Sequence, residues 1–288
     1  LGMATDYLRF EGISFMKNVH STEILKSVCD EFVVRDGDVV ILSYPKSGTN
    51  WLVEIISLIH SKGDPCWVQS VLTWDRSPWI ETIDGYERVN NQKDPRIYSS
   101  HLPIQLFPKS FFNTKAKAIY LIRNPRDVIT SGYYFNKALR CVQNPELFEE
   151  YFECFLPGNV PYGSWFDHTL GWMSMRGKEN FLIISYEELH QDIRASVERI
   201  SQFLGKKLSS DELNSVLKNV SFEVMKDNKM SNFSLVPDDI MDHSKGKLLR
   251  KGITGDWKNH FTVAQSEAFN KTYQEKMGEL PQGFFPWE

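Results

Sequence analysis

One segment of the sequence, residues 43–51, has the composition of an anion-binding loop. Gly48 permits a tight turn, after which backbone N–H groups can point at an anion at the start of a helix. A cation, polar donors and an aromatic ring surround this glycine, in the order Lys46, Ser47, Thr49, Asn50 and Trp51. The segment differs from the Walker sequence, in which the lysine follows the glycine. It predicts binding of a phosphate-like group, with Trp51 suited to contact an adenine ring.

Two further basic segments extend this prediction. Arg123 follows an apolar run, and its planar guanidinium suits a phosphate; the hydroxyl of Ser131, early in the next helix, could join it. Arg250 and Lys251 precede Gly252 in a flexible basic loop that could close over an anion. The whole chain has a net charge of −4. Three basic elements in such a chain indicate a focused anion pocket.

His101 is the best candidate for a general base among the seven histidines. It follows a predicted strand at residues 96–100, and Pro103 fixes the turn after it. A neutral imidazole can take the proton of an alcohol while the alcohol oxygen attacks. Lys46 would stabilise the charge that develops on the departing group. The sequence has no HExxH motif, no CxxC pair and no acidic triplet, so we expect no metal.

These residues follow the strands of a predicted parallel sheet. Short, apolar runs typical of buried strands lie at 39–42, 118–122 and 181–184, and residues 96–100 are predicted as a further strand. Helical patterns lie at 52–59, from about 127, at 193–204, 211–219 and 262–277. Strands that alternate with helices predict an α/β fold, a parallel sheet flanked by helices. Such sheets bind ligands at the carboxyl ends of their strands, where these candidate residues lie.

Length and composition limit the class of protein. The 288 residues contain 33 Lys and Arg against 37 Asp and Glu, which argues against a nucleic-acid binder. No apolar window is long enough to span a bilayer, and no signal peptide is visible; Leu1 and Gly2 look like an addition ahead of Met3. Four scattered cysteines fit a reducing compartment. We expect one domain over residues 1–288, a cytoplasmic location, and no membrane partner.

Together the basic segments resemble the signatures of the cytosolic sulfotransferases. The matching stretches are Tyr-Pro-Lys-Ser-Gly-Thr-Asn-Trp at 44–51, Arg-Asn-Pro-Arg-Asp at 123–127 and Arg-Lys-Gly-Ile-Thr-Gly-Asp-Trp-Lys-Asn-His-Phe at 250–261. The resemblance is strongest to the hydroxysteroid and bile-acid branch, through residues 107–112, 162–168 and the ending Phe-Pro-Trp-Glu. It implies transfer of a sulfuryl group from 3′-phosphoadenosine 5′-phosphosulfate (PAPS) to an apolar alcohol, with His101 as the base.

The resemblance also implies a division of the donor site. The 5′-phosphosulfate is assigned to residues 46–51. The 3′-phosphate is assigned to Arg123, Ser131, Arg250, Lys251 and Gly252, and the adenine to Trp51, Tyr186, Phe222 and Met225; Ser221 is assigned to the donor site as well. Two departures stand out. Val220 replaces a hydroxyl that many members place near the adenine, and Ser99 replaces a lysine of the phenol-sulfating branch.

The acceptor pocket and a dimer contact are implied in the same way. The resemblance places Phe15, Trp79, Phe135 and Tyr162 on the acceptor cavity, which suits a sterol-like body with one hydroxyl. Asn136 stands where close relatives have Trp, so a polyhydroxylated acceptor such as a bile acid could enter. Residues 231–247 suggest a mobile lid. A weak homodimer is implied by the KxxxTVxxxE motif of Lys258, Thr262, Val263 and Glu267.

Two other functions compete with this interpretation. A nucleotide kinase would share the strand–loop–helix phosphate site, but the position of Lys46 before the glycine counts against it. A non-catalytic carrier of apolar molecules would have no use for both Lys46 and His101.

Overall fold

A four-stranded parallel sheet lies at the centre of the protein. The computed structural model describes residues 7–142 and 144–288. The sheet has the order β4-β3-β5-β6, formed by β3 (Val39–Ser43), β4 (Ile97–Ser100), β5 (Lys117–Ile122) and β6 (Phe181–Ser185). All three neighbouring pairs are parallel. The α/β class predicted from the sequence is confirmed.

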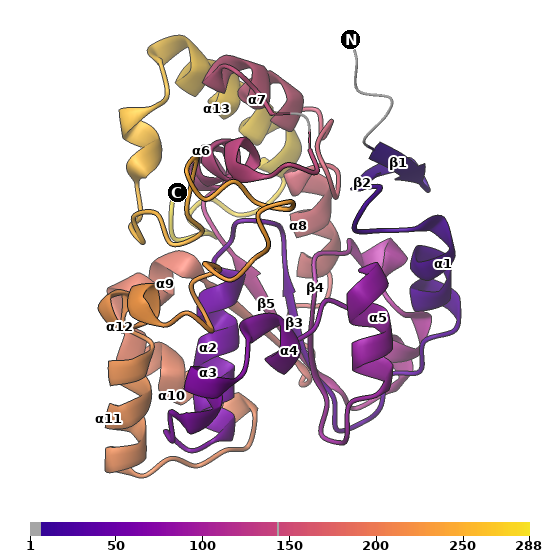
Figure 1. The fold of residues 1–288 in the computed structure, drawn as a ribbon. Coiled ribbons are helices and arrows are strands. Elements are labelled where there is room, and N and C mark those ends of the chain that lie inside the picture. The colour runs from indigo at the N-terminus through magenta and orange to yellow at the C-terminus, as the bar shows by residue number, and fades with distance from the viewer. Residues whose placement is uncertain (1–6, 143) are drawn as a thin grey trace.

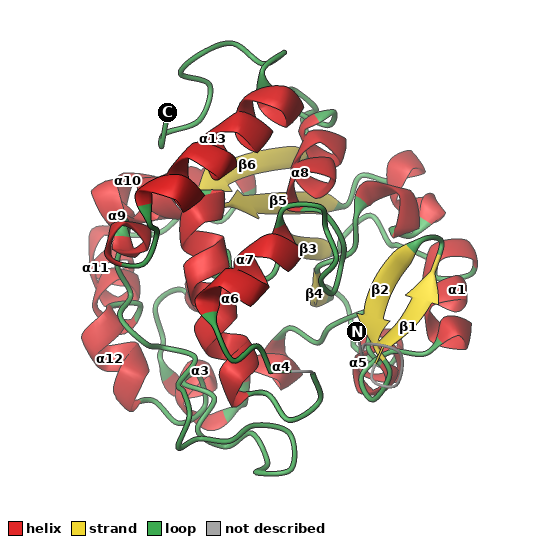
Figure 2. Ribbon diagram, turned by 90° about the horizontal axis from the view of Figure 1, so that it is seen from above, coloured by secondary structure: helices red, strands yellow, loops and turns green. Residues whose placement is uncertain are grey.

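Alternate residues of each strand face two separate cores. In β3, Val40 and Leu42 belong to one apolar core, whereas Ile41 between them belongs to the other. The second core is built with α2 (Thr49–His60), α10 (Ile193–Phe203) and α11 (Ser210–Asn219). The first is built with α1 (Thr22–Asp30), α6 (Pro125–Ala138), α7 (Phe148–Phe155), α8 (Trp165–Met173) and α13 (Val263–Met277). Helices therefore cover both faces of the sheet (Figure 2), as unbroken apolar strands require.

Several short elements complete the fold. The strands β1 (Tyr7–Phe10) and β2 (Ile13–Met16) form an antiparallel hairpin apart from the main sheet. Short helices are α3 (Cys66–Ser70), α4 (Thr73–Arg76), α5 (Ile83–Asn90), α9 (Tyr186–Gln191) and α12 (Phe222–Asp227). Single 3-10 turns lie at Ile104–Leu106, Lys109–Asn113 and Asp256–Asn259. The sequence analysis predicted none of these, because their apolar residues are too few to show a period.

A buried ion pair joins β3 and β4 at the end of the sheet away from the candidate residues. The Arg96 guanidinium donates to both carboxylate oxygens of Asp38, at 3.0 and 2.7 Å, and the Tyr98 hydroxyl donates to the same carboxylate at 2.9 Å. Asp38 and Arg96 are both 1% exposed. This cluster fixes the two strands that carry the phosphate loop and His101.

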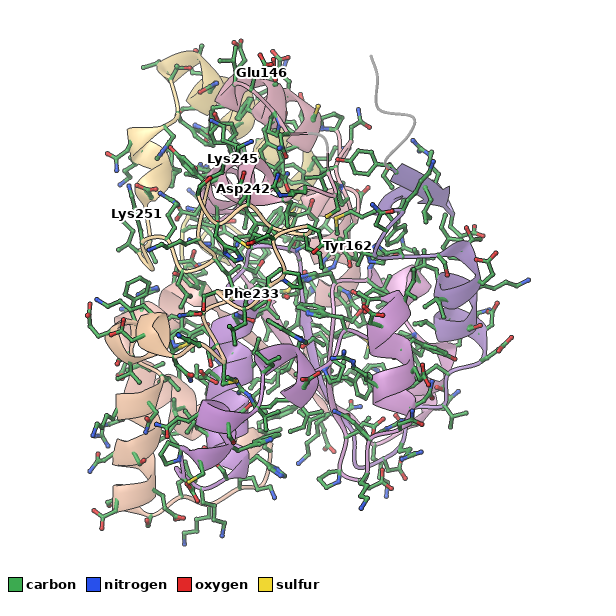
Figure 3. All side chains as sticks on the ribbon, in the orientation of Figure 1. Glu146, Tyr162, Phe233, Asp242, Lys245 and Lys251 are labelled. Carbon is green, nitrogen blue, oxygen red and sulfur yellow. The ribbon has the colours of Figure 1, made fainter. Side chains whose placement is uncertain are left out.

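A long irregular segment, residues 228–255, runs from α12 across the front of the molecule (Figure 1). Its middle is attached to the end of α6, where the Arg140 N–H donates to the Ile240 carbonyl and the Asp242 N–H to the Ala138 carbonyl, at 2.8 and 2.7 Å. Figure 3 labels Phe233, Asp242 and Lys245 along this path. No helix in the described residues is long and apolar enough to cross a membrane.

Candidate active site

The residues that follow the four strands meet at one cavity. Lys46 follows β3, His101 follows β4, Arg123 follows β5 and Tyr186 follows β6, and all four line a cavity of about 350 Å³. The carboxyl ends of parallel strands meet at one edge, so the topology brings these positions together. Residues 248–253 of the basic loop line the same cavity.

The phosphate loop has a shape that only glycine permits at its turn. Gly48 lies at the N-cap of α2 with φ +99°, and a Cβ there would meet the Tyr186 ring at 2.6 Å. The Thr49 hydroxyl is bonded to the Ser43 hydroxyl at 2.6 Å, which ties the first turn of α2 back to β3. The Ser47 hydroxyl is buried and has no hydrogen-bond partner among the described residues. An anion at the helix start would supply that partner.

Lys46 is a half-buried residue in a left-handed backbone conformation, with φ +67°. Its ammonium lies over the Phe135 ring, 4.1 Å from the centroid. Desolvation by burial, the largest cause, and the positive charges of Arg123 and Arg250 together lower its pKa to about 7. A bound anion would reverse this effect, because an opposite charge favours the protonated amine.

Arg123 links the loop to the wall of the cavity. Its Nη1 donates to the Lys46 carbonyl at 2.8 Å, and its guanidinium lies 4.1 Å from the Tyr186 ring centroid. Its buried Nε–H has no partner in the part of the chain that the structure describes. Ser131, also predicted here, lines the cavity from α6.

The basic loop is held by two aspartates. Arg250 and Lys251 donate to the two carboxylate oxygens of Asp256, at 2.7 and 2.8 Å. Burial alone would raise the pKa of Asp256, but the hydrogen bonds from the two cations outweigh burial and hold that pKa well below its usual range. Asp127, at the start of α6, accepts the Gly255 N–H at 2.8 Å and so attaches the loop to the helix. Gly252 has φ +63°, and a Cβ there would meet the Phe222 ring at 2.4 Å.

An aromatic wall adjoins the phosphate loop. Trp51, Tyr186, Phe222 and Met225 line the cavity as the sequence predicted. Sequence analysis missed His190, which lines the same wall with its ring centroid 4.8 Å from that of Trp51. One helical turn separates it from Tyr186, and that spacing could have identified it. Ser221 does not line the cavity; its hydroxyl instead caps α12 by accepting the Val224 N–H.

Val220 contributes through its backbone. The Trp51 indole N–H donates to the Val220 carbonyl at 2.9 Å, and the Val220 residue is 1% exposed. Replacing a hydroxyl by an apolar side chain at this position therefore leaves the Trp51 ring fixed.

The donors of Ser47 and Arg123 that have no partner among the described residues, together with this aromatic wall, fit a nucleotide with more than one phosphate.

His101 is held in the tautomer that a general base needs. Its Nδ1 lies 2.7 Å from the Ser43 carbonyl oxygen. A carbonyl only accepts, so Nδ1 carries the proton and the lone pair of the neutral ring lies on Nε2. The described residues offer no hydrogen-bond partner to Nε2, and the ring lines the cavity. The Trp79 ring lies 4.2 Å away, centroid to centroid.

Burial lowers the pKa of His101 to about 3, although the bond to Ser43 opposes that shift. The ordinary imidazole value near 6.5, which a surface histidine would have, therefore does not apply. The ring stays neutral over the whole range from weak acid to weak base, so it remains able to accept a proton.

A buried polar network that sequence analysis missed supports this histidine. The Glu81 carboxylate, fully buried, accepts the His101 N–H at 2.8 Å and the Tyr162 hydroxyl at 3.2 Å. The Tyr162 hydroxyl also lies 2.8 Å from Nε2 of His20. Burial raises the pKa of Glu81 to about 7. No local motif marks these contacts, because they join residues 20 to 142 positions apart.

The predicted acceptor residues line the same cavity as His101, with one exception. Trp79, Phe135 and Tyr162 line the cavity, and Asn136 lines it from the last turn of α6. Phe15 does not: it is fully buried behind Tyr162, with the two ring centroids 5.4 Å apart. The hairpin reaches the cavity through its next residue, Met16. A strand's alternating faces explain the error, since adjacent residues point to opposite sides.

The residues predicted to form a dimer contact lie elsewhere on the surface. All four are exposed, Lys258 in the 3-10 turn before α13 and the others at the start of that helix, and Val263 is 77% exposed: Lys258, Thr262, Val263 and Glu267. Within residues 7–142 and 144–288, no group of three or more His, Cys, Asp or Glu side chains is placed to hold a metal ion.

The fold and cavity define a group-transfer site: an anion-binding loop, four cations and a neutral histidine at the edge of a parallel sheet. The sulfotransferase domain model matches residues 36–281. Sulfotransferase 2A1 of Homo sapiens is 60% identical over 287 residues, covering 99% of this chain and all of that protein. The 3-beta-hydroxysteroid sulfotransferase of Cavia porcellus is 58% identical over 286 residues, covering 99% of each. The chain belongs to the sulfotransferase family.

Solved structures agree with this assignment. A crystal structure of mouse sulfotransferase SULT7A1 complexed with PAP superposes with a TM-score of 0.80 at 32% identity, covering 95% of this chain and 94% of that one. The family predicted from the loop sequences is confirmed, and the protein is an enzyme of the sulfotransferase class. The alternative of a nucleotide kinase is not favoured by any of these matches.

Proposed function

We propose that this sulfotransferase moves the sulfuryl group of PAPS to a hydroxyl of a steroid-like alcohol, with His101 as general base. One observation carries the proposal. His101, with its lone pair on Nε2, lines the same cavity as the buried ammonium of Lys46 and the phosphate loop. A base for an alcohol proton and a cation for a departing phosphate thus lie at one site.

His101 and Lys46 account for the proton and the charge that move in the transfer step. PAPS supplies the sulfuryl group: the acceptor oxygen forms a bond to sulfur while the bond from sulfur to the bridging phosphate oxygen breaks. The acceptor proton goes to Nε2 of His101. Lys46 stabilises the negative charge that collects on the product phosphate, in the way that cations assist phosphoryl transfer.

The donor's identity is supported by the distribution of cations. The family's donor, PAPS, carries phosphates at both ends, and the cavity is lined by cations from three segments of the chain. The phosphate loop with Lys46 suits the 5′ end, while Arg123, Arg250 and Lys251 suit the 3′-phosphate, with Trp51, Tyr186 and His190 beside the adenine. The 32%-identical mouse relative was crystallised with PAP, the corresponding product.

The acceptor class is supported by the walls around His101. Trp79, Phe135 and Tyr162 present rings to the cavity, and such walls suit a rigid apolar body. The 58%-identical relative from Cavia porcellus is named a 3-beta-hydroxysteroid sulfotransferase. Asn136 and Tyr151 add polar groups to this part of the cavity, which favours an acceptor with a second oxygen, as in a bile acid.

The proposal extends to location and assembly. We place the enzyme in the cytoplasm, the compartment of the family that its loops resemble. A homodimer through the start of α13 is supported by the exposure of its apolar residue, Val263. A contact this short would bury less than the roughly 1,200 Å² of a standard interface and would dissociate on dilution.

Replacing Arg250 should remove recognition of the 3′-phosphate. We expect Arg250→Ala to weaken binding of PAP by about 1.5–3 kcal/mol, the range for a hydrogen bond to a charged group. Adenosine 5′-monophosphate lacks the 3′-phosphate, so its affinity should hardly change. Calorimetric titration of both nucleotides measures the difference, and Lys247→Ala, an exposed cation nearby, is the control. A variant that discriminates the two nucleotides as strongly as the parent contradicts the assignment.

Replacing His101 should remove proton transfer while leaving the donor site. We expect His101→Ala to bind PAP like the parent and to transfer labelled sulfate from PAPS to a hydroxysteroid about 10²–10⁴-fold more slowly. Because burial lowers the pKa of His101 to about 3, the parent's activity should stay level as pH falls through 6.5. Any loss from protonating this ring should begin only at lower pH and be absent in the variant.

The matched control is His60→Ala, which changes a histidine that does not line the cavity. Parallel loss of PAP affinity and rate in His101→Ala would make His101 a structural residue. A parent that transfers no sulfate to any hydroxysteroid, bile acid or phenol would overturn the function itself.

A charge at Val263 should dissociate the dimer. We expect Val263→Glu to sediment as a monomer at concentrations where the parent is dimeric, because two carboxylates would face each other across a two-fold contact. Val33→Glu alters an equally exposed valine, 68% against 77%, on another surface and should leave the dimer intact. An unchanged dimer in Val263→Glu places the contact elsewhere.

A further inference from the structure

A second buried ion pair lies beneath the phosphate loop. Nη1 of Arg76, on α4, lies 2.7 Å from Oε1 of Glu54, on α2, and both side chains are at most 1% exposed. Removing two charges from water costs several kcal/mol per ion. A protein in which apolar residues of similar size replace such a pair is often as stable. The best-supported role of such a pair is to fix a single arrangement of the groups around it.

Ser231 connects this pair to the start of the irregular segment. Its hydroxyl donates to Oε2 of Glu54 and accepts from Nη2 of Arg76 and Nδ2 of Asn228, each at 3.1 Å. The Ser231 residue is 1% exposed. The turn after α12 is thus attached, through one hydroxyl, to both α2 and α4.

The same turn touches the donor side of the cavity. Nδ2 of Asn50, in the first turn of α2, donates to the Ser231 carbonyl at 3.1 Å. Asn50 lines the cavity within the phosphate loop. The Ser231 carbonyl therefore fixes which way the Asn50 amide faces.

The segment reaches the cavity two residues later. Phe233 lines the cavity and contacts the Trp74 ring edge to face, with centroids 5.3 Å apart. Its backbone has φ +64°, a conformation that a bulky residue adopts only when its surroundings impose it. Trp74 and Arg76 on α4 thus hold Phe233 and Ser231, and Figure 3 shows Phe233 where the segment begins to cross the molecule.

We propose that the Glu54–Arg76–Ser231 cluster is a positioning device that couples the phosphate loop to the segment over the cavity. Ser231 orients Asn50 toward the donor and fixes the point from which Phe233 enters the cavity wall. The inference rests on the proposed function only in taking a nucleotide as the occupant of the loop.

The test compares two buried serines of the same cluster. Ser57 accepts from Nη1 of Arg76 at 2.9 Å and is also 1% exposed, but its hydroxyl donates within α2, to Val53. Ser231→Ala and Ser57→Ala should lower the melting temperature similarly. Only Ser231→Ala should weaken PAP binding, by about tenfold, the effect of roughly one hydrogen bond. Ser231→Thr keeps the hydroxyl and should retain the parent's PAP affinity.

A double-mutant cycle identifies the route. If Ser231 acts through Asn50, then Ser231→Ala should weaken PAP no further once Asn50 is alanine, because coupled residues are not additive. Additive effects, or equal losses of PAP affinity in Ser231→Ala and Ser57→Ala, would overturn the inference. A parent that does not bind PAP would instead reject the proposed donor, so the two failures are distinguishable.

Discussion

The desolvation of the Lys46 ammonium is the constraint on which the site depends. The side chain lies over the Phe135 ring, and no ion pair to it occurs among the described residues. Burial, with a smaller contribution from the charges of Arg123 and Arg250, lowers the pKa of Lys46 to about 7. A desolvated cation beside two others is unfavourable until an anion arrives. Three features indicate that a bound anion is missing from this site. The backbone at Lys46 is left-handed, and the Ser47 hydroxyl and the Arg123 Nε–H have no hydrogen-bond partner among the described residues.

Desolvation also acts on the acceptor side, where it favours the proposed reaction without a bound anion. Burial lowers the pKa of His101, so the ring is neutral and therefore able to accept a proton. The Ser43 carbonyl holds its ring in one tautomer, and Glu81 holds its backbone N–H. Polar groups thus fix the base from behind, while Trp79 and Tyr162 leave an apolar face toward the acceptor.

The parts of the site that local sequence determines were predictable, and those that depend on distant packing were not. Lys46, His101 and Arg123 each lie within three residues of the end of a strand, so the strand pattern placed them at one edge. Glu81 and His20 reach that edge only through contacts that join separate parts of the chain. Phe15 shares its strand with Met16, and only the packed hairpin shows which of the two faces the cavity. The network around Ser231 depends likewise on α2 and α4 meeting a turn 155 to 177 residues later.

Proton uptake on nucleotide binding tests the central claim, that an anion completes the buried Lys46 site. PAP is titrated calorimetrically at pH 8 in two buffers of different ionisation enthalpy. At this pH the phosphates of PAP are already ionised, because their second pKa lies near 6. Free Lys46, with a pKa of about 7, is mostly neutral at this pH, and the bound phosphate favours its protonated form. The account predicts uptake of nearly one proton per PAP, abolished in Lys46→Met. Binding without proton uptake, or equal uptake in the variant, would contradict it.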